Sequence, residues 1–407
     1  MNVYDTLEER GFVDQMTHAD EIKDKLNNDK VTFYIGYDPT ADSLTIGGLV
    51  TIMAAVHLQR AGHRPIMLLG GGTGMIGDPT DKMEARKMMT PEQIAANLEG
   101  IREQLARFLD FSSEDKGLFV NNGDWLMGLG YVETLRNVCI HFSVNRMLTA
   151  DAFKTRMERD AGLTLFELNY MVMQAYDFLH LNRQYGCTMQ MGGRDQWSNI
   201  IAGADLVRRV DRKAAYGLTF PLLTRFDGEK MGKSLDGAIY LDANKTSPYE
   251  FFQYLRNTDD RDVVKFMKLF TFLQIDEIER MAEENINEAK KILAYDVTAR
   301  VHGEQAAQDA MAAAAALFGG GGDTSAMPVT ELNASDLADL TLTGLLVKTA
   351  LAPSNSEARR LITQGGVSLA GVKVEDPNRI ITADDFTDGE LIVKKGKKAF
   401  HKVRTTV

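Results

Sequence analysis

The chain has 407 residues, of which 44% are hydrophobic and 25% are charged, and its formal net charge is −11. This length predicts two or three domains with ample apolar cores. The negative charge opposes binding of nucleic acid over the whole surface. The acidic start, MNVYDTLEER, is unlike a signal peptide, and no apolar run approaches the roughly 18 residues that cross a bilayer. We therefore expect a cytoplasmic protein that does not bind membranes.

The cysteines of the chain also support a cytoplasmic location. The two cysteines, Cys139 and Cys187, have no spacing typical of metal ligands. We expect them to be buried and reduced, as in cytosolic proteins, and we predict no metal site made by the chain itself.

The first clear structural unit lies within residues 31–69. Residues 31–37 are β-branched and aromatic, which predicts a buried strand. Residues 47–61 carry apolar side chains at helical spacing and end at Gly62, and residues 65–69 form a second apolar run. This is the pattern of a βαβ unit. Ligands bind beyond the carboxyl ends of parallel strands, so we expect a site after residue 37.

Further strands are predicted at residues 117–122, 185–191 and 218–223, and helical patterns separate them. The pattern is all-helical from Ser247 and ends in four glycines. We expect a Rossmann-like, doubly wound α/β domain with a parallel sheet, an α-helical domain, and a small C-terminal α+β domain. The expected ranges are 1–225 for the first domain with a helical insertion at about 124–185, 226–318 for the second, 319–340 for a flexible linker and 341–407 for the last.

Three stretches carry polar or glycine residues in patterns typical of ligand binding. Tyr170, Gln174 and Asp177 have the spacing of one helix face. Residues 192–197, GGRDQW, follow a predicted strand and begin a helix, where anionic groups bind well. Residues 230–234, KMGKS, put two lysines on a glycine-containing loop, which suits a migrating phosphate group.

A glycine pattern suggests a different function. Gly72-x-Gly74-x-x-Gly77 is a formal match to the dinucleotide fingerprint and follows a strand. Asp78-Pro79 comes directly after it, where the fingerprint requires a continuing helix. A nicotinamide-dependent oxidoreductase is therefore a weak alternative.

Two signatures carry a family resemblance. YIGYDPTADSL and the following Thr45-Ile46-Gly47-Gly48 resemble the nucleotide-binding loop of class I aminoacyl-tRNA synthetases, and most closely that of the bacterial tyrosyl-tRNA synthetases. The family usually has His-Ile-Gly-His there, so Thr45 and Gly48 replace both histidines. Residues 230–234 resemble its second signature, Lys-Met-Ser-Lys-Ser, with Gly232 in the serine position. The resemblance covers nearly the whole chain in order.

The resemblance implies the following sites. The tyrosine substrate would contact Tyr34, Asp78, Tyr170, Gln174, Asp177 and Gln196, with Tyr34 and Asp177 at its phenolic hydroxyl. ATP would contact Gly36, Asp38, Gly47, Gly48, Thr51, Gly193, Asp195, Lys230, Met231, Lys233 and Ser234. The residues that stabilise the transferring phosphates would be Thr40, Thr45, Lys82, Arg86, Lys230 and Lys233. Arg194 stands where the family usually has serine.

The C-terminal region resembles an S4 RNA-binding domain. In this resemblance Ser356 would cap a short helix that stops at Gly365, and a hairpin would turn at Ala370-Gly371. A basic tail follows, whose charges suit RNA phosphates. The expected RNA-binding residues are Arg359, Arg360, Lys394, Lys395, Lys397 and Lys398.

The resemblance implies tyrosine activation by ATP, accompanied by Mg2+, and transfer to tRNA(Tyr) by a homodimer that associates through the helical insertion. The missing histidines keep a second interpretation open. In that interpretation the chain is a catalytically weakened relative that acts mainly as an RNA-binding protein. Tyrosine-dependent exchange between ATP and pyrophosphate separates the two.

Overall fold

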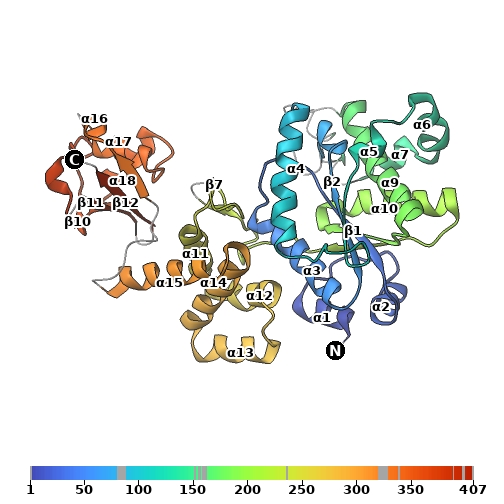
Figure 1. Cartoon of the computed structure of the whole chain (residues 1–407), viewed down its shortest axis with the longest axis horizontal. Helices are drawn as coiled ribbons and strands as arrows, with labels where there is room; N and C mark the ends of the chain where they lie inside the picture. The colour runs from blue at the N-terminus through green and yellow to red at the C-terminus, as the bar shows by residue number, and fades with distance from the viewer. Residues whose placement is uncertain are drawn as a thin grey trace. The chain divides into compact units, whose positions relative to one another are not determined.

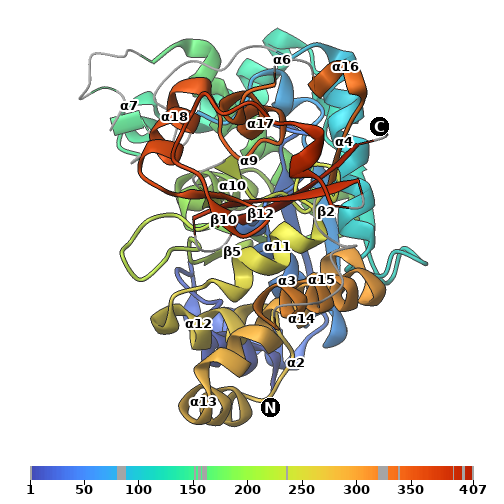
Figure 2. The ribbon, with the colours of Figure 1, turned by 90° about the vertical axis from the view of Figure 1, so that its left-hand side faces the viewer.

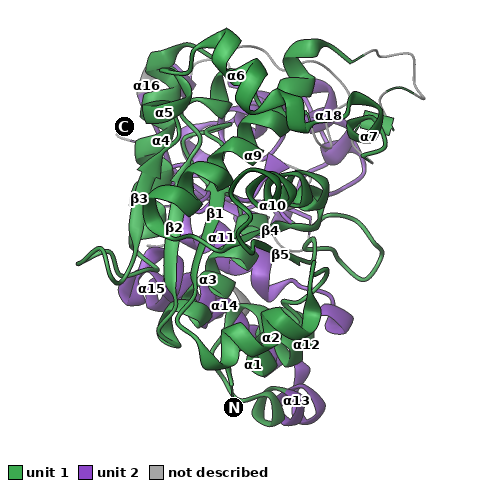
Figure 3. Ribbon diagram, turned by 90° about the vertical axis from the view of Figure 1, so that its right-hand side faces the viewer, with its two compact units in different colours: residues 1–231, 264–278 green, residues 232–263, 279–407 purple. Residues whose placement is uncertain are grey.

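The computed structural model describes residues 2–79, 89–150, 153–154, 157, 163–234, 237–319, 329–337, 340–387, 389–396 and 399–405. The chain forms two compact units, shown in different colours in Figure 3: residues 1–231 with 264–278, and residues 232–263 with 279–407. The domain limits expected from the sequence remain predictions. Among the helices described, none combines the length and the apolar character needed to span a membrane.

The first unit contains a parallel sheet whose strand order is β3-β2-β1-β4-β5. The strands are β1 (Thr32–Tyr37), β2 (Arg64–Leu69), β3 (Leu118–Asn121), β4 (Met189–Gly193) and β5 (Tyr216–Phe220). The order reverses between β1 and β4, so the predicted doubly wound α/β fold is confirmed. In Figure 1, α4 lies on one side of these strands and α9 and α10 lie on the other.

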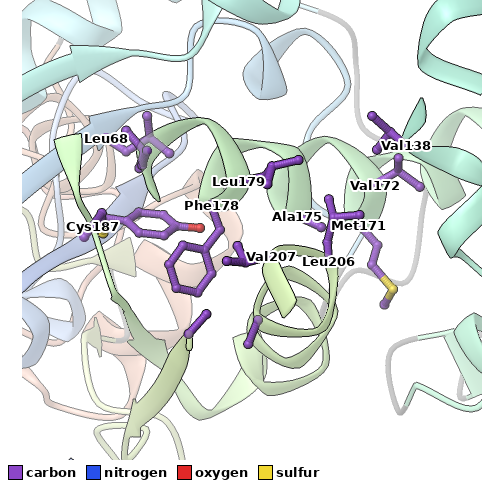
Figure 4. Close-up of a cluster of buried hydrophobic side chains, with 14 of the residues drawn as sticks. Leu68, Val138, Met171, Val172, Ala175, Phe178, Leu179, Cys187, Leu206 and Val207 are labelled. Atoms are coloured by element: carbon purple, nitrogen blue, oxygen red, sulfur yellow. The ribbon is translucent and has the colours of Figure 1, made fainter. Parts of the chain in front are cut away.

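The helices of this unit follow the sequence patterns. They are α1 (Val3–Arg10), α2 (Ala19–Asn28), α3 (Leu49–Arg60), α4 (Pro91–Ala106), α5 (Gly123–Leu126), α6 (Tyr131–Asn137), α7 (Val144–Met147), α9 (Leu165–Tyr185) and α10 (Trp197–Asp211). Thr90 and Thr164 close capping boxes at the starts of α4 and α9. Figure 4 shows the apolar cluster formed by α9 and α10, in which Phe178 and Leu206 are buried. Tyr34 of β1 belongs to the same cluster, which fixes α9 against the sheet.

Two predicted strand ranges are wrong. Residues 185–191 do not form a strand throughout, because α9 continues to Tyr185 and ends at Gly186, whose φ of 65° is left-handed. The strand β4 starts only at Met189. The strand predicted at 218–223 is β5, which ends at Phe220 because the next residue is Pro221, which has no N–H for the ladder.

A helical region follows, with the elements β6 (Lys233–Ser234), β7 (Gly237–Ala238), α11 (Pro248–Arg256), α12 (Asp260–Phe270), α13 (Ile275–Glu284), α14 (Ile286–His302) and α15 (Glu304–Gly319). Ser247 caps α11 through the predicted capping box, and Pro248 occupies the first helical position. Helix α12 begins in the second unit, and its residues from Val264 onward belong to the first.

The C-terminal region has a five-stranded mixed sheet, ordered β10-β9-β11-β12-β8. Its elements are β8 (Val329–Leu332), α16 (Ala334–Leu337), α17 (Leu342–Lys348), α18 (Asn355–Thr363), β9 (Val367–Leu369), β10 (Val372–Lys373), β11 (Glu390–Lys395) and β12 (Ala399–Thr405). Figure 2 shows α17 and α18 on one face of these strands. Ala370 and Gly371 both have positive φ, as a type I′ hairpin turn requires.

The predicted cap of the helix in this region is wrong. Helix α18 starts two residues earlier than expected, and Ser354 is its N-cap. The Ser354 hydroxyl accepts a hydrogen bond from the Glu357 N–H, while Ser356 lies inside the first turn. The predicted stop is close to the observed one, because Gly365 follows the helix with a φ of 67°.

Candidate active site

Two predicted site residues, Asp38 and Gly193, and two residues that the sequence did not predict, Gly70 and Asn122, gather at the carboxyl end of the sheet. Asp38 follows β1, Gly70 follows β2, Asn122 follows β3, and Gly193 ends β4. The strands are parallel, so these four positions all lie at the carboxyl end of the sheet. The switch point between β1 and β4 is at the same edge, where doubly wound folds bind ligands.

One end of the site is a buried carboxylate on α9. Asp177 is 1% exposed, and its oxygens accept hydrogen bonds from Asn122 Nδ2 at 2.9 Å and Trp125 Nε1 at 2.8 Å. The hydroxyl of Tyr34 is also buried and has no hydrogen-bond partner among the described residues. The Tyr34 ring packs edge-on against Phe178 at 5.4 Å. A buried hydroxyl without a partner costs free energy, so this end of the site is suited to a ligand that supplies one.

Burial dominates the electrostatics of this end. It raises the pKa of Asp177 to about 8, although the hydrogen bonds from Asn122 and Trp125 act in the opposite direction. Burial and the neighbouring Asp177 also raise the pKa of Tyr34 well above its usual value. Burial therefore favours the neutral forms of Asp177 and Tyr34 in the free protein.

A second cluster of polar side chains lies at the other end of the site. The Tyr170 hydroxyl donates to Asp38 Oδ2 at 2.8 Å, and Gln196 Nε2 donates to Asp78 Oδ2 at 2.7 Å. Gln174 Nε2 donates to Gln196 Oε1 at 3.3 Å, which leaves the buried Gln174 Oε1 without a partner among the described residues. Two carboxylates and an unpaired amide oxygen are acceptors, so they suit a cationic ligand group.

The glycine-rich stretch that follows β2 allows the backbone to pack closely against this hydrogen-bond network. A Cβ on Gly70 would overlap Asp38 Oδ1, and one on Gly74 would lie 2.6 Å from Pro39 Cγ. Thr73 Oγ1 donates to Asp38 Oδ1 at 2.8 Å. A short 3-10 helix, Thr73–Met75, follows the first glycines. The fingerprint requires an α-helix that begins at this point, so the dinucleotide interpretation loses its structural context.

The first signature opens helix α3. Residues Ile46–Gly48 form a 3-10 turn, and the Gly48 N–H donates to Thr45 O at 2.9 Å. Thr51 Oγ1 donates to Gly48 O at 2.9 Å and lies 3.0 Å from the Tyr37 hydroxyl. The Thr45 side chain makes no capping bond to this turn. Thr40 and Gly36, the other predicted residues of this loop region, are exposed.

The second signature follows a hairpin. Thr224 stands opposite Lys230, whose side chain is exposed, and the predicted turn at Asp227-Gly228 has a φ of 83° at the glycine. Gly232 has a φ of 98°, which favours glycine over the family's serine, and its N–H donates to the Tyr254 hydroxyl at 2.9 Å. The side chains of Lys233 and Ser234, and the whole of Lys82 and Arg86, lie outside the described part of the chain.

The GGRDQW stretch has the predicted strand-to-helix geometry. Asp195 Oδ2 accepts from Gln196 Nε2 at 2.9 Å, and a Cβ on Gly193 would lie 2.5 Å from Asp195 Oδ1. Gly193 therefore has no room for a side chain beside Asp195. Arg194 is exposed, and its guanidinium lies 3.4 Å from Asp14 Oδ1.

The C-terminal region exposes part of the predicted basic surface. Arg359 and Arg360 are exposed on α18, and Arg360 forms an ion pair with Glu357 at 2.6 Å. Lys394 Nζ lies 5.0 Å from the centre of the Phe400 ring. Lys395 ends β11, while Lys397 and Lys398 lie outside the described residues.

Other basic residues of the same tail have a structural role. Lys402 is only 2% exposed and pairs with Glu390 at 2.9 Å, and Arg404 binds the same carboxylate at 2.9 Å. Both cations therefore help to hold β11 against β12.

Comparison with known proteins agrees with this geometry. The class I tRNA synthetase family (W and Y) matches residues 26–319, and the SYY-like C-terminal domain of tyrosine–tRNA ligases matches residues 322–403. The tyrosine–tRNA ligase of Acetivibrio thermocellus is 53% identical over 407 residues, and that of Clostridium kluyveri is 55% identical over 405 residues; each match covers 99% of both chains. The chain belongs to the tyrosine–tRNA ligase family.

Solved structures of this family share the fold. A C-terminally truncated mitochondrial tyrosyl-tRNA synthetase from Aspergillus nidulans has a TM-score of 0.70 and 28% identity, and the match covers 78% of this chain and 94% of that chain. The tyrosyl-tRNA synthetase of Archaeoglobus fulgidus, complexed with L-tyrosine, has a TM-score of 0.57 and 18% identity over 76% of this chain and 99% of that chain. The second likeness supports the fold alone.

Two residues that contact Asp177 in the candidate site were missed in the sequence. Asn122 and Trp125 donate the two hydrogen bonds to Asp177, yet they lie more than 50 residues upstream of it. The available signal was their position at the carboxyl end of the strand predicted at 117–122, which Asn122 ends and Trp125 follows, because parallel strands deliver site residues there.

Proposed function

We propose that this chain activates L-tyrosine with ATP to give tyrosyl-adenylate and pyrophosphate, and then transfers tyrosine to tRNA(Tyr). The observation that carries the proposal is the paired occurrence of Asp177 and the unpartnered Tyr34 hydroxyl in a buried site. A phenolic hydroxyl both donates and accepts, so it would satisfy the Asp177 carboxylate and Tyr34 together. Phenylalanine would leave the Tyr34 hydroxyl unpaired and would offer no donor to Asp177.

The ammonium group of tyrosine would bind at the opposite end. Gln174 Oε1, Asp78 and the Tyr170 hydroxyl supply acceptors there, and Gln196 orients Asp78 through a 2.7 Å hydrogen bond. With both ends of tyrosine held, its carboxylate would face the α-phosphate of ATP. The substrate brings its own nucleophile, so the protein supplies position and charge.

ATP would lie over the glycine loops at the carboxyl end of the sheet. The residues proposed to contact it are Gly36, Asp38, Gly47, Gly48, Thr51, Gly193, Asp195, Lys230, Met231, Lys233 and Ser234. Thr40, Thr45, Lys82, Arg86, Lys230 and Lys233 would stabilise the charge that develops on the departing pyrophosphate. The described residues hold no cluster of three or more metal-binding side chains, so Mg2+ would enter with ATP as part of the substrate.

The C-terminal domain would bind tRNA through its basic residues. Arg359 and Arg360 on α18 and Lys394 and Lys395 on β11 are the described members of this surface, and Lys397 and Lys398 extend it along the sequence. We expect this binding to weaken as salt rises, because phosphate contacts release counterions. We expect the enzyme to work in the cytoplasm.

The chain would act as a homodimer. The helices between β3 and α9, and the start of α9, expose large apolar side chains, among them Tyr131 at 75%, Ile140 at 71% and Leu165 at 69%. An apolar surface of this kind favours association with a second copy. The substitution Ile140→Asp should shift the sedimentation coefficient from dimer to monomer. A monomeric wild-type protein would contradict the proposal.

Exchange between ATP and pyrophosphate tests the activity. The expected result is exchange that requires tyrosine and is not supported by phenylalanine. A protein without tyrosine-dependent exchange that still binds tRNA would instead be the RNA-binding relative. Exchange at equal rates with both amino acids would contradict the proposed roles of Asp177 and Tyr34.

A further inference from the structure

In the hairpin before the second signature, the backbone carbonyl of Thr224 needs a hydrogen-bond donor from outside the hairpin. The Met231 N–H donates to Leu223 O, and the Arg225 N–H donates to Glu229 O, both at 2.8 Å. These two bonds flank the pair formed by Thr224 and Lys230, which is therefore a non-hydrogen-bonded pair. In such a pair the Thr224 carbonyl points away from the strand that carries Lys230 and needs a donor from elsewhere.

Lys265 of α12 supplies that donor. Its Nζ lies 2.7 Å from Thr224 O and 3.5 Å from Thr224 Oγ1. The far end of α12 is anchored in turn by the buried guanidinium of Arg10, which donates to the carbonyls of Lys268 at 2.9 Å and Thr271 at 2.8 Å. These residues and the tyrosine pocket all belong to the first unit. The stem opposite Lys230 is therefore connected to the body that holds the amino acid.

We infer that Lys265 is a positioning residue for Lys230 in adenylate formation. It acts through its hydrogen bond to the strand that faces Lys230 and does not contact the substrates. A hydrogen bond from a charged donor is stronger than a neutral one, so its loss leaves the stem less firmly held. Misplacement of a phosphate-binding group by about 1 Å lowers a rate by up to about a hundredfold. The inference rests on the proposed role of Lys230 toward the phosphates.

The test is single-turnover adenylate formation by full-length Lys265→Met, with tyrosine dissociation measured separately. We expect the rate constant to fall about tenfold and tyrosine affinity to stay at the wild-type value. Lys265→Arg should recover most of the rate, because a guanidinium can donate to the same carbonyl. Lys268→Met removes the same charge from the same helix and should leave the rate unchanged. Equal losses in rate and tyrosine affinity would indicate a general structural defect and overturn the inference.

The variant Lys230→Met and the double variant Lys230→Met/Lys265→Met test the role of Lys230 and the role of Lys265 separately. If Lys265 acts through Lys230, the Lys265→Met substitution should have little further effect in the Lys230→Met background. Additive losses would overturn the inference and leave the proposed function intact. A wild-type rate for Lys230→Met would overturn the proposed role of Lys230, and the inference with it.

Discussion

The tyrosine end and the phosphate end of the site are built differently. The tyrosine end lies on regular elements, with Tyr34 on β1 and Asp177 on α9, and both side chains are 1% exposed. The phosphate end lies on loops, where Thr40 and Lys230 are exposed. Packed elements hold side chains in fixed positions, whereas loops allow motion around a changing substrate. We propose that the chain recognises the amino acid with a preformed pocket and binds the phosphates with segments that can move.

The largest effect on activation is expected from breaking the preformed pocket. Asp177→Asn removes the charged acceptor of the phenolic hydroxyl but keeps the size of the side chain. A hydrogen bond to a charged group contributes about 2–3 kcal/mol, so tyrosine affinity should fall by roughly 30- to 150-fold. Phenylalanine affinity, measured by the same equilibrium titration, is the internal control and should change little. Equal losses for the two amino acids would show that Asp177 is not the phenol partner.

A change of pH should have a smaller effect on tyrosine affinity. The pKa of Asp177 is raised to about 8 by burial, so the free protein holds this carboxyl protonated below that value. The proposed complex needs the ionised form as an acceptor, and binding below pH 8 therefore releases a proton. Tyrosine affinity should fall by up to about tenfold for each pH unit below 8 and should level off near pH 8. Asp177→Asn should abolish this slope, and a slope that persists in the variant would assign it to another group.

The smallest effect on activation is expected from removing the C-terminal domain. The residues proposed to contact tyrosine or ATP all lie at or before Ser234, Lys265 lies in α12, and the C-terminal family match begins at residue 322. A chain that ends at Gly322 should form adenylate at the full-length rate but should charge tRNA poorly. Single-turnover adenylate formation and tRNA charging, measured side by side, check this. Full charging activity in the truncated chain would rule out the proposed RNA surface.

The sequence predicts site residues that share one helix better than site residues that come together from separate elements. The capping box at Thr164 and the spacing of Tyr170, Gln174 and Asp177 lie on one helix, so local rules place them correctly. Asn122 and Trp125 reach Asp177 only through the pairing of β3 with β2 and the packing of α9 on the sheet, which no local pattern records.

The remaining errors of the sequence-based prediction concern the cap of α18 and the basic tail. Ser354 and Ser356 are equally good capping residues by type, and the observed helix start selects Ser354. The sequence shows only that the tail is basic, whereas the structure buries Lys402 and pairs both Lys402 and the exposed Arg404 with the carboxylate of Glu390. Such pairings depend on strand register, and the composition of the tail does not show it.

We propose that this chain has a complete tyrosine pocket and a phosphate end in which the shorter Thr45 hydroxyl and Gly48, which has no side chain, replace two histidine donors. Restoring the usual histidines with Thr45→His and Gly48→His tests it most directly. Gly48 has an ordinary helical φ of −69°, and a Cβ there would meet no atom closer than 3.9 Å, so the substitution fits the backbone. One preorganised donor to developing charge typically contributes roughly 3 kcal/mol.

The measurement is the rate constant for single-turnover adenylate formation, with the tyrosine dissociation constant determined in parallel. The account predicts a rate that rises by up to roughly a hundredfold and a dissociation constant that stays unchanged. An unchanged rate would contradict the account, because the chain would then stabilise the phosphates fully without the two histidines.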